Sequence, residues 1–315
     1  MKREKLDIKE IFLKDERFRT SYHFSPEKLK HSLKVVGLLN PPLVALRNNR
    51  FILVSGWKRV LACAELSFSP VPVLITEEKD DLKTFLMAFY ENLATREFSL
   101  LEKAEILTRL KRFGEDEKRI TQHYLPLLDT PATLAYLDTY LAFSQFEPEV
   151  KKAIHEKRMS FLSVKPLVEF SSQEREWLLP LLLPLGQNKH REMLEDILEV
   201  SKKNDTPVQQ ILFSPEIRAI QESKTLTPLQ KADRTLLLLR KKRYPALSSM
   251  QDSFESLLRK MDWPEEIRIS PSPFFETENF TVTFDFENEQ GLKASLLKLE
   301  ELSARRDFAE IFKLK

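Results

Sequence analysis

The chain has 315 residues, of which 42% are hydrophobic and 31% are charged, and its formal net charge is +2. This apolar content excludes wholesale disorder and is enough for two or three folded units, while the near balance of charge excludes a histone-like polycation. The single cysteine, Cys63, excludes internal disulfides and a cysteine-based structural metal site.

Neither the N-terminus nor the most leucine-rich run carries an export or membrane signal. Met1 is followed by charged residues, whereas a secretory signal needs an apolar core. The run Trp177–Leu185 is interrupted by Pro180 and Pro184 and is far too short to span a bilayer. We therefore expect a cytoplasmic protein.

Positive charge is concentrated at the front of the chain. Residues 1–75 hold fourteen Lys or Arg and seven Asp or Glu, which gives this stretch a net charge of about +7. Such a segment suits a polyanionic partner, either a nucleotide or a nucleic acid. The alternative is ordinary variation of a protein surface.

The segment 25–37 predicts the first helix. Ser25 is a suitable cap, Pro26 suits the first helical position and Gly37 suits the end. We expect its buried face to consist of Leu29, Leu33 and Val36.

Further short elements follow up to residue 98. Residues 43–54 predict a β-hairpin around the turn Asn48-Asn49. A helix is predicted over 57–66, a strand over 71–75 and a helix over 82–93. We interpret residues 1–98 as a compact α+β domain.

The junction between the hairpin and the next helix predicts a phosphate site. Unpaired amides at a helix start attract an anion, and Gly56 lets the backbone approach closely. Lys58 and Arg59 add full positive charges, and an arginine can grip two phosphate oxygens at once. The candidate residues are Ser55, Gly56, Lys58 and Arg59. The alternative is an amphipathic helix with two exposed cations.

The end of the helix over 82–93 predicts a metal site. Glu91 and Asn92 offer a carboxylate and a side-chain amide, hard oxygen ligands that suit Mg²⁺ bridging phosphates. The alternative is an exposed helix end.

Residues 99–260 show almost purely helical patterns. Within them, residues 115–143 predict a helix-turn-helix. The first helix is expected from Glu115 to about Tyr124, with a break at 125–129. The second is expected from Thr130, as cap, and Pro131 to about Phe143.

This helix-turn-helix and the helix after it supply the candidate DNA contacts. On the second helix the polar positions are Thr133, Tyr136, Asp138 and Thr139, with Gln145 just beyond. This is a poor set for reading bases because no Arg, Lys or Asn accompanies them. The candidate base contacts are Thr133, Tyr136 and Thr139. The alternative is a plain helical hairpin that packs or pairs. Phosphate contacts are expected from Lys151, Lys152, Lys157 and Arg158.

Residues 261–315 predict a small α+β unit. Phe280–Phe286 alternates apolar and polar residues as a half-buried strand does, and Ile267–Ile269 is placed to pair with it. We expect a helix striped by Leu292, Leu296 and Leu299 to cover this sheet. Dimerisation through this unit is our hypothesis.

The order and spacing of these motifs resemble the ParB/Spo-type partition protein family over roughly residues 7–165. That family has Gly-Glu-Arg-Arg, then a Val-Pro or Ile-Pro strand, then Glu-Asn-Leu-Gln-Arg, then Pro-Leu/Ile-Glu-Glu-Ala. The upstream segments Phe24–Leu29 and Gly37–Val44 match the family's opening helix and strand. The corresponding segments here are Gly56–Arg59, Val71–Val73, Glu91–Leu93 and Ser99–Ala104.

The resemblance implies an α+β ParB/sulfiredoxin-like N-terminal domain, an all-α middle with a helix-turn-helix and a small α+β C-terminal unit. It implies a homodimer that binds DNA and CTP, or another nucleotide, with Mg²⁺, and that meets a partition ATPase. Arg19 would join the phosphate contacts. The expected role is chromosome or plasmid partition, or DNA organisation, at the nucleoid.

Two departures from the family pattern matter. Trp57 stands where the family has a glutamate associated with hydrolysis, and tryptophan can neither orient water nor accept a proton. Ala94-Thr95 replaces Gln-Arg, so Arg96 comes one place late. Whether the chain is an enzyme, with weak CTP hydrolysis, stays open. The alternatives are a degenerate interaction scaffold without DNA binding, or a kinase or nuclease on this fold. Cys63 lies outside the Gly-X-X-Arg loop, which disfavours a sulfiredoxin-like repair enzyme.

Overall fold

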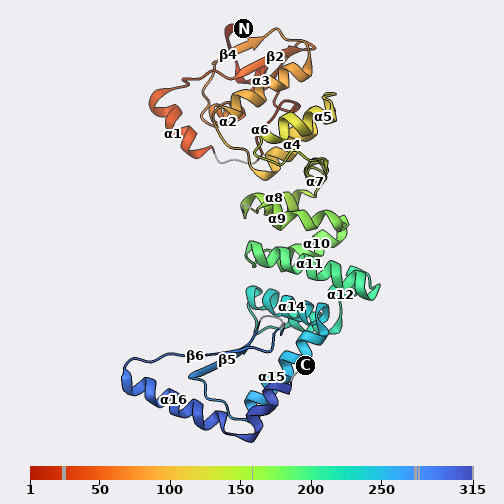
Figure 1. The fold of residues 1–315 in the computed structure, drawn as a ribbon. Coiled ribbons are helices and arrows are strands. Elements are labelled where there is room, and N and C mark those ends of the chain that lie inside the picture. The colour runs from red at the N-terminus through yellow and green to blue at the C-terminus, as the bar shows by residue number, and fades with distance from the viewer. Residues whose placement is uncertain (23–25, 158, 273–274, 276, 314–315) are drawn as a thin grey trace. The chain divides into compact units, whose positions relative to one another are not determined.

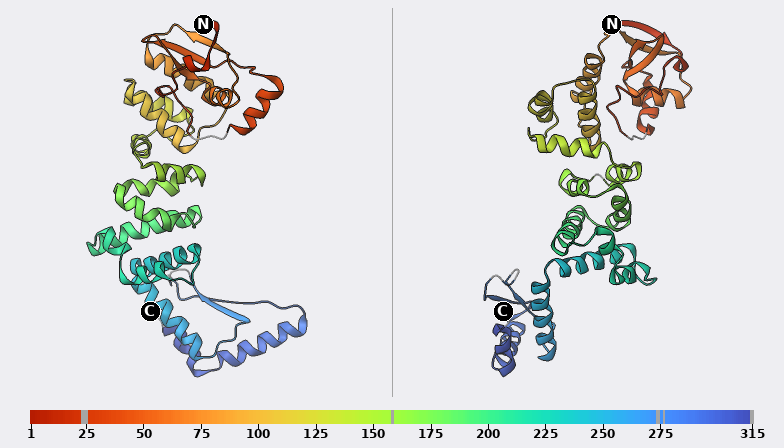
Figure 2. Two further views of the ribbon diagram at one scale, coloured as in Figure 1. Left: turned by 180° about the vertical axis from the view of Figure 1, so that it is seen from behind. Right: turned by 90° about the vertical axis from the view of Figure 1, so that its right-hand side faces the viewer.

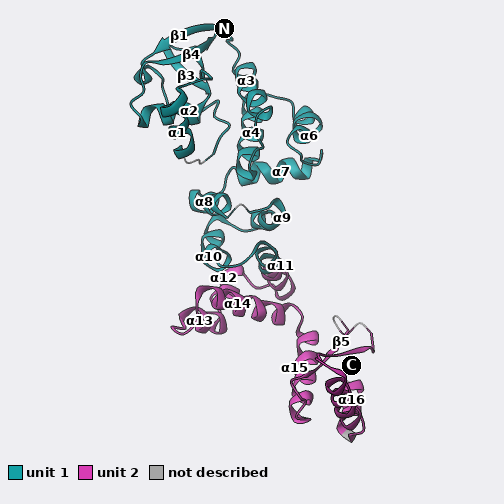
Figure 3. Cartoon of the chain, turned by 90° about the vertical axis from the view of Figure 1, so that its left-hand side faces the viewer, with its two compact units in different colours: residues 1–194 teal, residues 195–315 magenta. Residues whose placement is uncertain are grey.

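The computed structural model describes residues 1–22, 26–157, 159–272, 275 and 277–313 (Figure 1). The chain forms two compact units, Met1–Leu194 and Glu195–Lys315 (Figure 3). Each unit is described by itself.

A four-stranded sheet organises the N-terminal part of the first unit. Its strands are β1 (Lys2–Leu6), β2 (Leu43–Arg47), β3 (Arg50–Ser55) and β4 (Val71–Thr76), in the order β1-β4-β2-β3. β4 runs parallel to β2, and the other two pairings are antiparallel. The predicted hairpin and third strand are confirmed, whereas β1 was not predicted.

The hairpin turn has the backbone that its sequence favours. Asn48 and Asn49 both have positive φ, 48° and 58°. Two consecutive residues of this kind make the tight turn that matches the twist of paired strands, and asparagine tolerates this conformation better than most residues. The turn therefore fixes the register of β2 against β3, with Arg47 opposite Arg50.

Helices α1 (Glu27–Val36), α2 (Trp57–Glu65) and α3 (Asp81–Leu93) accompany the sheet (Figures 1 and 2). Gly37, with φ 72°, ends α1 as predicted. Pro26 is the residue before α1 rather than its first residue, and Ser25 lies outside the described residues. Leu29 and Leu33 face the core as expected, but Val36 is 53% exposed, so that part of the predicted stripe is wrong.

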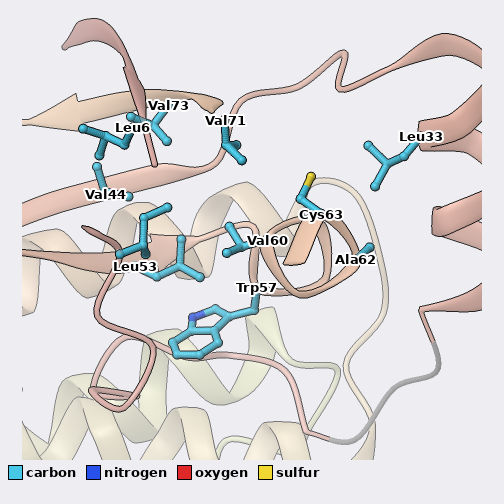
Figure 4. Packing of buried hydrophobic residues seen from close by; sticks show 11 residues of the cluster. Leu6, Leu33, Val44, Leu53, Trp57, Val60, Ala62, Cys63, Val71 and Val73 are labelled. Atoms are coloured by element: carbon cyan, nitrogen blue, oxygen red, sulfur yellow. The ribbon is translucent and has the colours of Figure 1, made fainter. Parts of the chain in front are cut away.

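A hydrophobic cluster fills the space between α1, α2 and the sheet (Figure 4). Leu53, Val60 and Cys63 are fully buried in it. Burial raises the pKa of the Cys63 thiol, as expected for a core cysteine. Trp57 belongs to the same cluster and lies at its edge, with the other labelled side chains on one side of its ring.

The rest of the first unit is helical, as predicted, but two boundaries differ around the expected helix-turn-helix. Consecutive helical segments run from Glu117 through Leu127, with a π-helical turn at Ile120–Tyr124, so the predicted break at Leu125 is wrong. Helix α7 (Leu134–Phe143) begins after Thr133 and not at Thr130. Thr130 is buried and donates its hydroxyl to the carbonyl of Leu128, which makes it part of the turn.

The remaining helices complete the two units. In the first unit the further elements are α4 (Leu100–Arg112), α5 (Glu117–Arg119), η2 (Ile120–Tyr124), α6 (Leu125–Leu127), α8 (Pro148–Glu156), α9 (Phe161–Val164), η3 (Lys165–Glu169) and α10 (Ser172–Leu182). Helix α11 (Gln187–Asn204) crosses the boundary, and α12 (Val208–Leu212), α13 (Pro215–Glu222), α14 (Pro228–Arg243) and α15 (Pro245–Lys260) follow. No helix in the described part of the chain has both the length and the apolar character needed to cross a membrane.

The second unit ends in a two-stranded antiparallel sheet of β5 (Ile267–Pro271) and β6 (Phe280–Phe284), followed by α16 (Glu289–Ser303) and η5 (Arg306–Lys313). The predicted pairing is confirmed, with Ile269 opposite Val282. The sheet packs on Phe254 of α15 and on residues of η5. Among the described residues its hydrophobic cluster contains none from α16, so the expected cover by that helix is wrong.

Candidate nucleotide and DNA sites

Gly56 makes the turn between β3 and α2 possible. Its φ of 96° and ψ of 22° are left-handed, and a Cβ at this position would lie 2.8 Å from the Cβ of Pro42. Both facts restrict the position to glycine. The close approach is therefore to Pro42, a neighbour within the protein. No side chain caps the start of α2, so its first amides have the polarity that suits an anion.

Arg59, on the first turn of α2, reaches α3. Its Nη2 donates to Glu91 Oε1 at 2.9 Å. Its Nη1 donates to the backbone carbonyls of Asn40 and Pro41 at 2.7 and 3.2 Å. The predicted phosphate-binding residue and the predicted metal-binding residue thus lie in contact, although 32 positions separate them. A phosphate at Arg59 would compete with these protein acceptors.

The predicted metal ligands differ in how well they fit Mg²⁺. The Glu91 side chain is 44% exposed, and its second carboxylate oxygen can face a cation. Asn92 is differently engaged: its Oδ1 accepts from Arg96 Nε at 3.0 Å and its Nδ2 donates to the Ala88 carbonyl. An oxygen that faces a guanidinium does not fit a metal. Within the described residues no three acidic, histidine or cysteine side chains gather as a metal site, so the phosphates of a ligand would have to complete the coordination.

Arg96 is a site residue that the sequence-based selection missed. Its guanidinium contacts Asn92 Oδ1 and forms an ion pair with Glu102 at 2.9 Å. Its Nη2 also lies 3.5 Å from the carbonyl of Thr20. Arg96 follows Asn92 by four residues, a spacing that brings side chains together even just beyond a helix end. This four-residue spacing could have indicated from the sequence that Arg96 contacts Asn92.

Charges around Arg96 are unevenly balanced. Burial lowers the pKa of Lys58, and the neighbouring Arg96 lowers it further. Burial acts to raise the pKa of Glu102, but Arg96 and the Ser99 amide hold it below its usual value. Glu102 therefore stays ionised and pairs with Arg96, and Lys58 lies near the same guanidinium.

The segment from Arg19 to Tyr22 lies beside the start of α2. The Arg19 guanidinium carbon lies 5.3 Å from the centre of the Trp57 ring, and Arg19 Nη2 donates to the Tyr22 carbonyl at 3.0 Å. Arg19 also pairs with Glu16. Arg19 is thus next to the predicted site, as expected from the resemblance. Ser55 is buried at the end of β3.

The second helix of the predicted helix-turn-helix offers few exposed polar groups. Thr133 is exposed just before α7, and Tyr136 is half-buried and stacks on Phe161 with ring centres 4.6 Å apart. Thr139 is buried and donates its hydroxyl to the Ala135 carbonyl at 2.7 Å. Helix α7 contains no Lys or Arg. Contacts to bases would therefore have to come mostly from Thr133 and Tyr136.

The residues predicted to contact DNA phosphates differ in exposure. Lys152 and Lys157 are exposed. Lys151 is half-buried and donates to the Ser144 carbonyl at 2.6 Å, with Glu105 nearby at 3.4 Å. Arg158 lies outside the described residues. The lysines that remain available to a phosphate backbone are Lys152 and Lys157.

Residues 2–93 match the model of the ParB N-terminal domain. Residues 2–93 are thus similar to a ParB N-terminal domain. The matched segment contains the whole four-stranded sheet and both halves of the Arg59–Glu91 contact. The expected ParB-type α+β domain, helical middle and small C-terminal α+β unit are confirmed.

Several curated relatives are chromosome-partitioning proteins. The chain is 23% identical over 158 residues to the probable ParB of Borreliella burgdorferi, covering 50% of this chain and 58% of the relative. It is 24% identical over 184 residues to Spo0J of Thermus thermophilus, covering 57% and 66%. It is 31% identical over 121 residues to ParB of Myxococcus xanthus, covering 38% of each. The similarity thus spans less than two thirds of these relatives.

Solved structures of ParB proteins are also similar. A C-terminally truncated ParB of Caulobacter crescentus, complexed with CTP-gamma-S, is 16% identical, with a TM-score of 0.28, and the match covers 55% of this chain and 94% of that one. The same protein complexed to the centromeric parS site is 14% identical, with a TM-score of 0.35, and the match covers 61% and 98%.

Proposed function

We propose that this protein binds a nucleotide with Mg²⁺ at the start of α2 and binds DNA through the helices that follow α4. Its role would be chromosome or plasmid partition, or a related organisation of DNA at the nucleoid. The observation that supports this most is the 2.9 Å contact of Arg59 with Glu91. An arginine suited to phosphate and a carboxylate suited to Mg²⁺ come from two separate motifs and meet at one point.

Within this proposal the protein's own residues bind rather than convert the nucleotide. Arg59 and Lys58 would hold phosphate oxygens, and the uncapped amides of α2 would add partial positive charge. Mg²⁺, when bound with the nucleotide, would neutralise phosphate charge beside Glu91. Trp57 offers no general base. We therefore propose CTP binding with little or no hydrolysis.

Calorimetric titration of the full chain with CTP and Mg²⁺ tests the proposal. Arg59→Ala should weaken binding by about tenfold or more, because a charge-assisted contact is lost. Arg112→Ala is the matched control, since Arg112 is an exposed arginine of the same unit. Equal binding by wild type and Arg59→Ala would refute the site, and titration with ATP and GTP establishes the preferred base.

DNA binding is proposed for the helical segments at residues 117–143 together with α8. The exposed Lys152 and Lys157 would contact phosphates, and Thr133 and Tyr136 would approach the groove. Because α7 carries no cation, backbone contacts would dominate. Affinity should therefore depend strongly on salt and weakly on sequence.

A protein-binding scaffold is the second candidate. It is favoured by Thr139 and Lys151, whose polar groups are engaged inside the protein. A scaffold would show no salt-dependent binding to random duplex DNA, whereas the proposed DNA-binding protein releases counterions on binding. Fluorescence anisotropy of a labelled duplex at several salt concentrations separates the two.

We also propose that the protein is a homodimer joined through α16 and β6. Leu296 and Leu297 of α16 are 50% and 61% exposed, and Phe286 after β6 is 54% exposed. β6 pairs on one side only, with β5. Exposed leucines and an open strand edge are features that a second copy can cover. A partition ATPase is the further protein partner that the family resemblance suggests.

A further inference from the structure

Three buried polar atoms, two on the segment 19–21 and one on the first residue of α2, have no hydrogen-bond partner among the described residues. They are Arg19 Nε, Ser21 Oγ and Trp57 Nε1. The arginine and indole nitrogens can only donate, and the serine hydroxyl can donate as well. Trp57 is only 5% exposed, so solvent does not reach most of its ring. A group of donors without acceptors indicates an oxygen acceptor from outside the protein.

The three donors lie on two segments that are held in place. Arg19 lies over the Trp57 ring at 5.3 Å. The backbone on either side of Ser21 is tied to the helices, since Tyr22 N donates to Glu102 Oε1 at 3.2 Å and Arg96 Nη2 approaches the Thr20 carbonyl at 3.5 Å. The donors are therefore fixed before a ligand arrives, which lowers the entropic cost of binding.

The surrounding charge favours an anion. Lys58 follows Trp57 in the chain, and Arg96 is close enough to Lys58 to disfavour its protonated form. Two carboxylates lie near the donors and are already engaged: Glu16 pairs with Arg19, and Glu102 accepts from Arg96, Ser99 and Tyr22. An anionic oxygen would satisfy these donors.

We propose that Trp57 is a binding residue of the nucleotide site, whose indole N–H, together with Arg19 and Ser21, donates to an anionic phosphate oxygen of the ligand. This inference rests on the proposed function and extends it to a residue that replaces a glutamate in the family pattern. The tryptophan at position 57 would then strengthen ligand binding, whereas the glutamate of the family pattern could act on water.

Calorimetry with the full chain tests the inference in three arms: CTP with Mg²⁺, inorganic triphosphate with Mg²⁺, and cytidine. Trp57→Phe keeps an aromatic ring and removes the N–H. It should weaken binding of CTP and of triphosphate by about tenfold, while cytidine binds weakly to both proteins. Trp177→Phe, in α10, is the matched control and should bind like wild type.

Ser21→Ala is the second variant, because it removes only a buried hydroxyl. Among the described residues of the ligand-free protein this hydroxyl has no partner. The thermal midpoint should therefore stay equal or rise, while CTP affinity falls several-fold. If Ser21 had a purely structural role, its replacement would not lower the affinity for CTP while leaving the thermal midpoint equal or higher.

The outcomes separate two failures. If wild type binds neither CTP nor triphosphate, the proposed function and this inference are both overturned. If wild type binds and Arg59→Ala does not, but Trp57→Phe and Ser21→Ala bind like wild type, only the inference is overturned. Loss of affinity for cytidine alone would overturn it too, because the donors would then face the nucleoside.

Discussion

Arg59 Nη2 and Glu91 Oε1 lie 2.9 Å apart, and this ion pair joins the first turn of α2 to the end of α3. The same guanidinium also donates to the carbonyls of Asn40 and Pro41. A nucleotide phosphate that takes the Nη2 group of Arg59 would displace Glu91 Oε1, and both oxygens of Glu91 could then face a metal ion. We therefore expect metal and phosphate to favour each other's binding, because Arg59 and Glu91 would exchange their mutual contact for contacts with the ligand.

Replacing Glu91 by glutamine tests this exchange. In EDTA, Glu91→Gln should bind CTP about two- to fivefold more tightly than wild type, because the carboxylate no longer competes for Arg59. With Mg²⁺ the order should reverse, since the variant lacks the carboxylate. Titration calorimetry in both buffers measures the two affinities. Glu97→Gln, an exposed neighbour, is the control, and weaker binding by Glu91→Gln in EDTA would contradict the exchange.

The contribution of α8 to DNA binding is measurable as a salt dependence. Removing two phosphate contacts with Lys152→Ala and Lys157→Ala should reduce the slope of log K against log salt by about 1.8. The double variant Lys202→Ala, Lys203→Ala, at the exposed end of α11, should leave the slope unchanged. Identical slopes for wild type and the α8 variant would remove these lysines from the interface.

Self-association is expected to depend on the leucines of α16. Replacing Leu296 and Leu297 by aspartate should convert a dimer to a monomer in analytical ultracentrifugation, because charges would be buried at the contact. Both side chains are at least half exposed in the single chain, so the monomer should keep its thermal midpoint. A wild-type chain that sediments as a monomer at high concentration would count against the proposed dimer.

The ion pair of Glu147 with Arg175 predicts a pH-dependent stability. Arg175 lies 2.7 Å from Glu147 and lowers the pKa of that carboxyl from 4.5 to about 2. Since the folded pKa is lowered, the pair stabilises the protein above pH 4.5 and this stabilisation is lost as the pH falls toward 2. The destabilisation caused by Glu147→Gln should therefore be largest near neutral pH and shrink below pH 4.5 in urea titrations. A destabilisation that is equal above and below pH 4.5 would contradict this role of the pair.

Short sequence patterns predicted those elements in which the alternation of apolar and polar residues reflects burial, or in which turn residues mark a boundary. The hairpin follows from two asparagines between apolar runs, and the β5–β6 pairing from the alternation of Phe280 to Phe284. Strand β1 was not predicted, because of its residues only Leu6 is buried and the others are mostly charged. Pro131 after Thr130 imitates a helix start, yet the buried Thr130 hydroxyl bonds inside the turn instead.

The candidate site, too, could be predicted only in part from local sequence patterns. Each motif could be found in the sequence, but the contact of Arg59 with Glu91 depends on how α3 packs against β3, which no local pattern states. Arg96 was left out of the selection because it follows the family motif one place late. The chain after α3 nevertheless brings it back to Asn92.

The burial of Cys63 has a practical consequence. It is the chain's one native thiol, it is fully enclosed, and its raised pKa keeps it protonated and unreactive at neutral pH. A maleimide or a bis-maleimide cross-linker added to the folded protein at neutral pH would therefore react with cysteines introduced on purpose rather than with Cys63. Reporter probes or cross-links between copies can be placed on α16 without first altering the native chain.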